Sequence, residues 1–463
     1  MEERDDYKFL KLSDAVSCLN QRVNLVGVVL ELGLPKKSKG TDFFISLKIA
    51  DESYSDPGIS VNFFAESVEK LPVVASPGDI ILLSHVVMKT HEREVYAFFN
   101  KKFSSFALYE GISSGDFSPY QVSARFRTRE LDKKFIADLR KWLTGFQLNT
   151  DPNDFQFLRE IKEGQRLSLI LKILRIHEVA EKEWVIYVWD GTDAPSKKIQ
   201  TKMTDEMDNP LPLQLEKEPL PRDELCTFPS VGSVLMVVLG EGNKNLGLGF
   251  LKTGMWLNFL NIICEVHAGL WRGVLMPFTK LRYVPKEYRY VLGCQRCYEE
   301  RLSEKWGRMP WSCFPSPSTV TEVEHDHVPP VTLRDVLTYP KVTAKFKCVI
   351  RVVAAFPCEA ENFLSPAGTY RVRLTIEDPT ARVHAFLYAE DGENFFDGHP
   401  STCVLKRRMN KLLGLNEDDD SKGTEYTDRN PPWVFCCLKS YYLNESDVWG
   451  SRRYRIFDTK LVG

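Results

Sequence analysis

The chain lacks an excess of charge of either sign. Its 463 residues include 61 lysines and arginines against 63 aspartates and glutamates, which gives a formal net charge of -2. A global positive field that attracts polyanions is therefore absent, and a phosphate-binding groove would have to arise from local clusters of basic side chains. The composition is otherwise that of an ordinary globular protein.

Long apolar runs are also missing. No stretch approaches the ~20 consecutive apolar residues that a membrane-spanning helix needs. The opening stretch, MEERDDYKFLKLSDAVSCLN, is too charged for the apolar core of a secretory signal. We therefore expect a soluble intracellular protein without a membrane partner, and these features do not separate nucleus from cytoplasm.

Recognisable catalytic motifs are absent as well. The sequence contains no Walker A motif, no GxGxxG after a strand, no HExxH and no GxSxG. Its many carboxylates show no catalytic spacing. We expect a protein that is not an enzyme, has no cofactor and has no small-molecule substrate.

Eleven cysteines are scattered along the chain and are expected to be reduced thiols. Cys294 and Cys297 have the spacing of metal ligands, but a structural zinc needs four ligands and no second CxxC exists. The other candidate ligands are Cys313, His325, His327, Cys348 and Cys358. A zinc site and a chance pair of thiols both stay open, and we expect the pair of thiols without metal.

Strand-like segments gather in three blocks of similar length. In the first block, turn signals such as Pro57-Gly58 and Pro77-Gly78 separate about five strand candidates, which suits a small barrel or sandwich. We expect strand-rich domains at 8–125, 151–285 and 336–463, joined by a helical linker at 126–150 and a loop-rich linker at 286–335. This organisation predicts a mainly β fold.

A helix is predicted over 129–145, where the apolar period changes to that of a helix. Its apolar stripe is expected to pack against a barrel, and its basic face, which includes Lys133, Lys134 and Lys141, is expected to be solvated. An aspartate also recurs near a strand end in each block, at Asp51, Asp190 and Asp378. We interpret Asp190 and its neighbour Trp189 as turn chemistry and barrel filling, with a functional site as the alternative.

Two Phe-Phe pairs suggest an outward aromatic surface in the first block. Neighbours in a strand point to opposite faces, so Phe63 belongs to the core face of its strand, whereas Phe44 and Phe64 lie on faces otherwise made of small polar residues and a lysine. Exposed rings stack on bases in proteins that hold single strands, and a nearby lysine can meet phosphate. Asn62 and Lys48 belong to the same outward faces. The alternative is that a loop or the 129–145 helix covers this surface.

Longer stretches resemble the protection-of-telomeres family. GVVLELGLPKKSKGTDFFISLKIADE and FSSFALYEG are similar to its first oligonucleotide-binding domain, and VIYVWDGTDAP is similar to its second. TIEDPTARVHAFLYAEDGENFF and VFCCLKSYYLNESDVWGSRRYRIFDT resemble its C-terminal domain. The order is that of the family, nearly the whole chain is covered, and the compact length resembles the plant branch. The resemblance implies three five-stranded Greek-key oligonucleotide-binding barrels with connecting helices.

The resemblance also implies which residues bind. Lys39, Gly40, Thr41 and Asp42 match the loop that meets DNA, and Phe64 matches a stacking ring. His91 stands where the family has a stacking tyrosine, and imidazole stacks more weakly. In the second domain an aromatic-acidic pair is replaced by Gly240-Glu241, which leaves its DNA face in doubt.

Two functions remain open. In the first, the protein binds G-rich single-stranded telomeric DNA, protects chromosome ends and regulates telomerase access and telomere length. In the second, it is a non-enzymatic interaction subunit of a telomerase or telomere-replication complex with weak or no DNA binding. The resemblance implies partners in such a complex, a place in the nucleus at chromosome telomeres, and a C-terminal domain that docks proteins. We find no outward aromatic face with lysine spacing like that of the first block in the third block.

Overall fold

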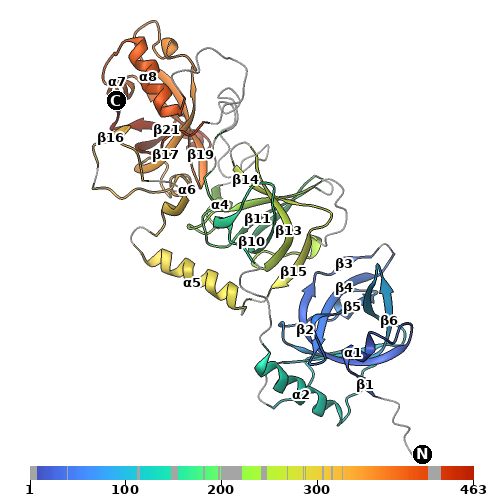
Figure 1. The fold of residues 1–463 in the computed structure, drawn as a ribbon. Coiled ribbons are helices and arrows are strands. Elements are labelled where there is room, and N and C mark those ends of the chain that lie inside the picture. Colours follow the sequence, from blue (N-terminus) through green and yellow to red (C-terminus); the bar gives the residue numbers. More distant parts are fainter. Residues whose placement is uncertain are drawn as a thin grey trace, which may run out of the picture.

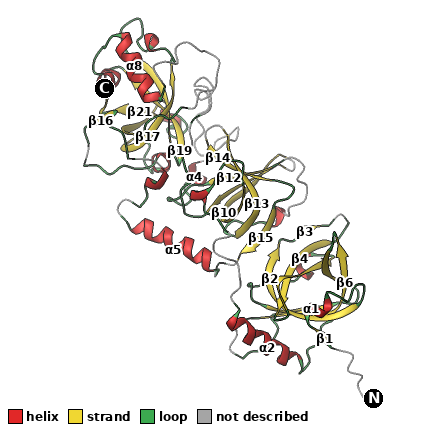
Figure 2. Ribbon diagram, viewed as in Figure 1, coloured by secondary structure: helices red, strands yellow, loops and turns green. Residues whose placement is uncertain are grey.

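The structure of the chain is a computed structural model. It describes residues 8–38, 40–111, 115–146, 155–180, 183–196, 199, 222–240, 248–267, 270–284, 286, 288–304, 307–313, 316–325, 327–415 and 429–462. Three barrels lie in a row along the molecule, with helices on its periphery (Figures 1 and 2).

The first barrel is built from β2 (Arg22–Gly33), β4 (Phe43–Asp51), β5 (Tyr54–Ala65), β7 (Glu94–Phe99) and β6 (Ile80–His91). They pair in this order, and β6 pairs back onto β2 to close the ring. The interior consists of the alternating apolar residues of the strands. The other elements are β1 (Phe9–Leu10), α1 (Leu12–Ala15), β3 (Lys36–Lys37), η1 (Val68–Lys70), β8 (Ser105–Tyr109) and β9 (Gln121–Val122).

The second barrel is built from β10 (Arg166–Ala180), β11 (Glu183–Trp189), β12 (Leu235–Leu239), β14 (Leu270–Leu275) and β13 (Trp256–His267). They too pair in this order, and β13 closes the ring on β10. The other elements are η3 (Leu158–Glu160), α4 (Arg222–Leu225), η4 (Leu248–Phe250) and β15 (Lys280–Val284).

The third barrel is built from β17 (Ala344–Phe356), β18 (Arg371–Asp378), β19 (Ala381–Tyr388), β21 (Arg452–Phe457) and β20 (Val434–Tyr442), and it is also closed. The other elements are η5 (Trp311–Cys313), β16 (Thr321–Val323), α6 (Leu333–Thr338), η6 (Ala360–Asn362), α7 (Glu390–Phe396), α8 (Thr402–Leu413), η8 (Glu445–Asp447) and β22 (Thr459–Leu461).

All three barrels share one topology. If the five strands of each barrel are numbered along the chain, the ring order is 1-2-3-5-4 in every case, and only strands 3 and 5 run parallel. This is the Greek-key arrangement of the oligonucleotide-binding fold. The expected fold class is therefore confirmed.

The repeated aspartate has the same structural role in each barrel. One carboxylate oxygen accepts a hydrogen bond from the first amide of the helical turn before the barrel, and the other accepts from a Ser or Thr two residues on. The three sets are Asp51 with Leu12 and Ser53, Asp190 with Leu158 and Thr192, and Asp378 with Leu333 and Thr380. Each carboxylate thus caps a helix and fixes a strand turn at once.

One predicted helix and one unpredicted helix connect the barrels. The helix expected over 129–145 is α2 (Asp132–Gly145), which buries Ile136 and Leu139 against the outer side of the first barrel around β2 and β8. Within 286–335, which the sequence suggests is loop-like, Arg289–Ser303 forms helix α5. Its buried residues, Val291 and Cys294, join a cluster with Trp189 and Trp256 of the second barrel, so tertiary packing stabilises a helix with only a short apolar stripe.

Direct contacts join successive barrels. β15 pairs with both β13 and β2, where Tyr283 opposes Leu32, so one strand links the first two barrels. At Gly33, which pairs with Arg282, a Cβ would lie 2.7 Å from the carbonyl oxygen of Ser46 in β4, so the close approach of β2 to β4 at this point requires glycine. Between the second and third barrels, the buried Arg334 of α6 donates to the Gly232 carbonyl at 3.1 Å.

Candidate nucleic-acid interface

The outward face of β4 and β5 carries the predicted aromatic surface. Phe44 lies opposite Phe64 in the strand register, and their ring centroids are 4.9 Å apart. The next outward pairs along the strands are Ser46 with Asn62 and Lys48 with Ser60. All these side chains are half-buried, so the rings shield one another and still reach the surface.

Phe63 and Phe64 divide as the alternation predicts. Phe63 is 1% exposed and packs in the barrel core, with Phe99 at 4.9 Å and Phe106 at 5.8 Å between ring centroids. Phe64 points to the other side of the sheet and contacts Phe98 at 5.7 Å. The aromatic surface is therefore separate from the core that holds the barrel together.

Phe98 and Tyr96 extend this surface and were missed from the sequence. β7 runs parallel to β5, with Phe98 beside Asn62 and Tyr96 beside Ser60. The buried Ala97 and Phe99 alternate with them, so the same parity argument applied to Glu94–Phe99 would have found both. Rings at Phe44, Phe64 and Phe98 thus form a row across three neighbouring strands, which we call the first aromatic face.

The cations near these rings differ from the predicted one. Lys36 lies 5.3 Å from the centroid of Phe44, and Lys89 lies 4.2 Å from that of Phe98. Lys48 instead pairs with Glu31 at 3.3 Å, and Arg282 of the second barrel reaches the same glutamate at 3.2 Å. Lys48 is therefore not the free lysine that the sequence predicted for contact with phosphate.

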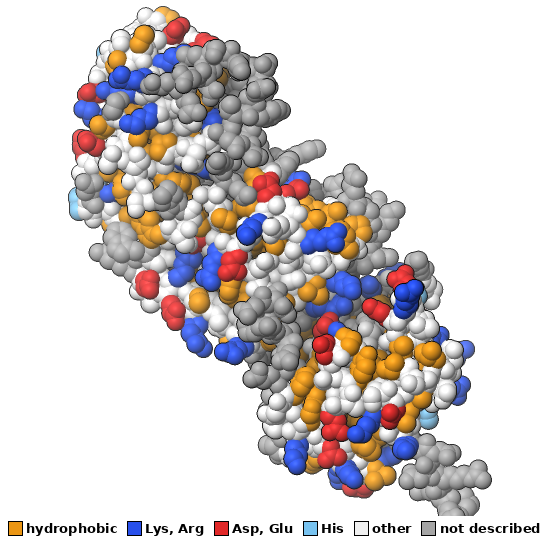
Figure 3. All heavy atoms as spheres, in the orientation of Figure 1, with side chains coloured by type: hydrophobic (Ala, Val, Ile, Leu, Met, Phe, Trp, Pro, Cys, Tyr) orange, Lys and Arg blue, Asp and Glu red, His pale blue; other side chains and the backbone are white. Residues whose placement is uncertain are grey.

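Lys36 lies in a basic cluster at the joint between two barrels. Burial, and after it the positive charges of Arg282 and Lys280, lower the pKa of Lys36. In Figure 3 basic side chains gather where the lower and middle barrels meet. The aromatic surface therefore ends beside a local positive field, although the chain as a whole is nearly neutral.

The loop before β4 lies at the Phe44 end of the aromatic face. Gly40 and Thr41 are exposed, and the Ser38 hydroxyl accepts from the Gly40 amide at 3.2 Å. Asp42 accepts from Lys101 through both carboxylate oxygens, at 2.9 and 2.8 Å, and this contact raises the pKa of Lys101. Lys39 lies outside the described residues. A base that bonds to Asp42 would have to share it with Lys101.

His91 is on the same side of the sheet but far from the ring row. It is exposed at the β6–β7 hairpin, where it opposes Glu94. Glu94 is four residues before Phe98, which is about 13 Å along a strand. The structure therefore does not bring His91 together with Phe64, and only a long bound strand would contact both.

Helix α2 does not cover the first aromatic face. It packs on the opposite side of the barrel, against Val28, Leu82 and Tyr109. Phe44, Phe64 and Phe98 are not among its contacts in the apolar cluster that it forms. The alternative in which the 129–145 helix hides the rings is therefore wrong.

The corresponding face of the second barrel is covered. Outward Tyr187 and Met236 of strands 2 and 3 pack with Leu225 and Phe228 from the segment around α4. Gly240 follows β12 and donates its amide to the Leu275 carbonyl, and Glu241 lies outside the described residues. This apolar cover agrees with the doubt that the sequence raised about a DNA face in the second domain.

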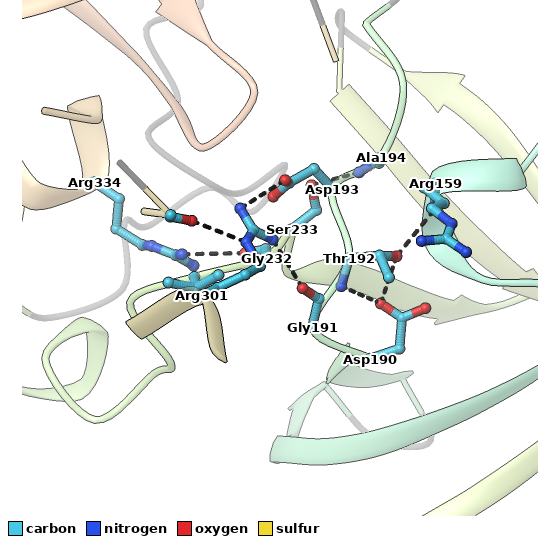
Figure 4. Close-up of polar contacts among 12 residues, drawn as sticks. Arg159, Asp190, Gly191, Thr192, Asp193, Ala194, Gly232, Ser233, Arg301 and Arg334 are labelled. Carbon is cyan, nitrogen blue, oxygen red and sulfur yellow. Dashed lines mark hydrogen bonds and ion pairs between the residues drawn. The ribbon is translucent and has the colours of Figure 1, made fainter. Parts of the chain in front are cut away.

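Asp190 and Trp189 are structural. Trp189 is 2% exposed and its indole nitrogen donates to the Val231 carbonyl at 2.7 Å. Figure 4 shows the turn after them, where Asp193 pairs with Arg301 of α5 at 2.8 Å. Burial raises the pKa of Asp190 and of Asp193. The turn joins the second barrel to α5 and lies beside the contact with the third barrel.

The candidate zinc ligands are dispersed. Cys294 is buried under α5, and Cys297 is exposed on the same helix. Cys313 and Cys348 are buried in separate clusters, Cys358 is exposed, and His325 contacts Asp458 at 3.1 Å. Among the described residues, no three His, Cys, Asp or Glu side chains are placed to hold a metal ion. No helix among the residues that the structure describes is long and apolar enough to cross a membrane.

Comparisons with known proteins agree with the barrel topology. Residues 3–153 match a family described as telomeric single stranded DNA binding POT1/CDC13, and residues 316–447 match a POT1A-like OB fold domain. A crystal structure of fission yeast Pot1 and ssDNA aligns over 64% of this chain and 96% of its own, at 16% identity and a TM-score of 0.28. The strand topology, rather than this alignment, establishes the fold.

Two relatives match over nearly the whole chain. Protection of telomeres protein 1b of Arabidopsis thaliana is 40% identical over 99% of this chain and 98% of its own length. Protection of telomeres protein 1a of the same plant is 38% identical over 100% of this chain and 99% of its own. The chain belongs to the protection of telomeres family.

Proposed function

We propose that the protein binds G-rich single-stranded telomeric DNA through the first aromatic face. By this binding it protects chromosome ends and regulates the access of telomerase. The row of Phe44, Phe64 and Phe98 on the outside of the first barrel carries the proposal. The description of the family that matches residues 3–153 supports it, as do the names of the two plant relatives.

Stacking supplies most of the proposed affinity. Each base stacked on an aromatic ring contributes on the order of 1–3 kcal/mol. Electrostatics contribute less, because the chain is nearly neutral and Lys48 and Lys101 already have carboxylate partners. The exposed loop of Gly40 and Thr41 would then contact the strand where it passes Phe44.

The protein acts by binding rather than by catalysis, and it works in the nucleus at telomeres. The chain is divided into three functional domains, at 8–125, 151–285 and 336–463, with linkers between them. Subunits of a telomerase or telomere-replication complex are its protein partners. Exposed apolar side chains at the end of β20 favour the third barrel as the docking site, with Tyr442 38% exposed and the following Leu443 69% exposed.

A matched pair of substitutions in the first barrel tests the DNA site. Phe64→Ala removes a ring from the first aromatic face and should weaken binding of single-stranded telomeric DNA by about 1–3 kcal/mol. Phe117→Ala removes a half-buried ring that contacts Arg140 elsewhere on the barrel, and it should leave affinity unchanged. Equal affinity of both variants and the parent would contradict the site.

A separate substitution tests the docking site. Leu443→Asp places a charge on an exposed apolar position and should abolish co-purification of the telomeric protein partners. DNA affinity should stay at the parent value, because Leu443 is in another barrel. Loss of DNA binding with partners retained would reverse the assignment.

A further inference from the structure

The third barrel carries a second outward face of rings and arginines on strands 2 and 3. In the register of β18 and β19, Arg371 lies opposite Tyr388 and Arg373 lies opposite Phe386. Phe356, at the end of β17, continues the row beyond Arg373. This surface was not predicted from the sequence, because the prediction required lysines beside the rings and arginines occupy the basic positions here.

Two rings of this face are largely open to solvent. Phe356 is 50% exposed and Tyr388 is 45% exposed. Guanidinium groups lie over them, with Arg373 at 5.1 Å from the centroid of Phe356 and Arg371 at 6.0 Å from that of Tyr388. Each of these two rings thus has a cation beside it and open surface around it.

The face keeps an excess of positive charge. Asp391 of α7 pairs with Lys439 and Arg455, and Arg455 also lies 5.6 Å from the ring centroid of Tyr388. The Arg371 side chain has no carboxylate partner among the described residues. Arg453, on the outward side of the next strand, donates to backbone carbonyls. One carboxylate therefore faces at least three basic side chains.

We propose that this face, defined by Phe356, Arg371, Phe386, Tyr388 and Arg455, is a second binding site for single-stranded nucleic acid. It occupies the same strands of the shared topology as the first aromatic face, whereas the second barrel has an apolar cluster there. Stacking rings with arginines beside them suit bases and phosphates together. The chemistry fits DNA or RNA.

The composition of the face favours nucleic acid over a protein partner. Outward residues of β18 and β19 are aromatic, basic or polar, apart from Glu377, which is buried between Arg351 and Arg382. The exposed end of the face lacks the aliphatic anchors that Leu443 offers elsewhere on the same barrel. The site goes beyond the proposed function, which assigns DNA to the first barrel alone. A strand held by both faces would extend along the row of barrels.

Photo-cross-linking of the full chain tests this site independently of the first. A 20-nucleotide telomeric DNA and an RNA of the same sequence are cross-linked, and the attached peptides are identified by mass spectrometry. We expect adducts on the peptide that contains Tyr388 with the DNA, the RNA or both. The nucleic acid that gives the stronger adduct is the one that the face prefers. Adducts confined to the first barrel at saturation would overturn the proposal. Tyr388 adducts without first-barrel adducts would support it and refute the proposed function.

Affinity measurements in a Phe64→Ala background provide the second readout. Adding Tyr388→Ala should weaken the remaining binding about tenfold, and adding Arg371→Gln should lower the salt dependence by about one phosphate contact. Tyr339→Ala and Arg407→Gln change exposed residues off the face and serve as controls. If Tyr388→Ala or Arg371→Gln loses a protein partner and keeps its nucleic-acid affinity, the proposal is overturned. If Tyr388→Ala fails to fold, the exposed Arg371→Gln decides alone.

Discussion

Phe63 and Phe64 are neighbours whose replacement should have opposite effects. Phe63→Ala removes a ring that is 1% exposed and contacts Phe99 and Phe106, so it should cost the first barrel about 3–5 kcal/mol of stability. Phe64→Ala loses one cross-strand aromatic pair with Phe44 and part of a contact with Phe98. That loss is about 1 kcal/mol, since such pairs contribute tenths to one kcal/mol each.

Hydrogen exchange is the suitable assay, because a chain of three barrels need not unfold in one step. Amides of β4 and β5 report the free energy of opening of the first barrel, and amides of β18 and β19 serve as an internal control. In Phe63→Ala the first set should exchange faster by a factor of hundreds or more, with the second set unchanged. Equal acceleration in both variants would refute the separation of core from binding surface.

Two further predictions concern the third barrel and the cysteines. Burial raises the pKa of Asp378 from 3.8 to about 6, so the folded state keeps a proton that the unfolded state releases, and stability falls as pH rises through that window. Asp378→Asn lacks this dependence on pH. The variant should melt below the parent, and the difference in melting temperature should be smaller at pH 7 than at pH 4.5. A difference that grows with pH would contradict the assignment. Elemental analysis should find no stoichiometric zinc, because Cys294 and Cys297 lie one turn apart on α5 but no third His, Cys, Asp or Glu side chain among the described residues joins them to hold a metal ion. One zinc per chain that is lost on replacing either cysteine would show that a site forms.

Strand alternation predicted the parts of the fold and site that depend on local pattern. It separated Phe63 from Phe64 and placed Phe44 on the outer surface, because parity within one strand fixes the face. It could also have found Phe98, which lies in an equally regular segment. It could not show that Phe98 lies beside Asn62, since that pairing depends on the ring order of the strands.

Contacts between distant parts of the chain were beyond the sequence. The partner of Lys48 is Glu31, which also binds Arg282, 251 residues away in the chain. Helix α5 forms because Val291 and Cys294 find an apolar surface on the second barrel, and its own stripe is too short to predict it. The face at Tyr388 was missed because arginines rather than lysines accompany the rings.

Titration of the full chain with single-stranded telomeric DNA at two salt concentrations tests the central claim most directly. We expect binding that is specific for the G-rich single strand over its duplex, that weakens only modestly with salt, and that Phe64→Ala reduces by about 1–3 kcal/mol at both concentrations. No binding at either concentration, or binding that Phe64→Ala leaves unchanged, would contradict the assignment of the first aromatic face to DNA.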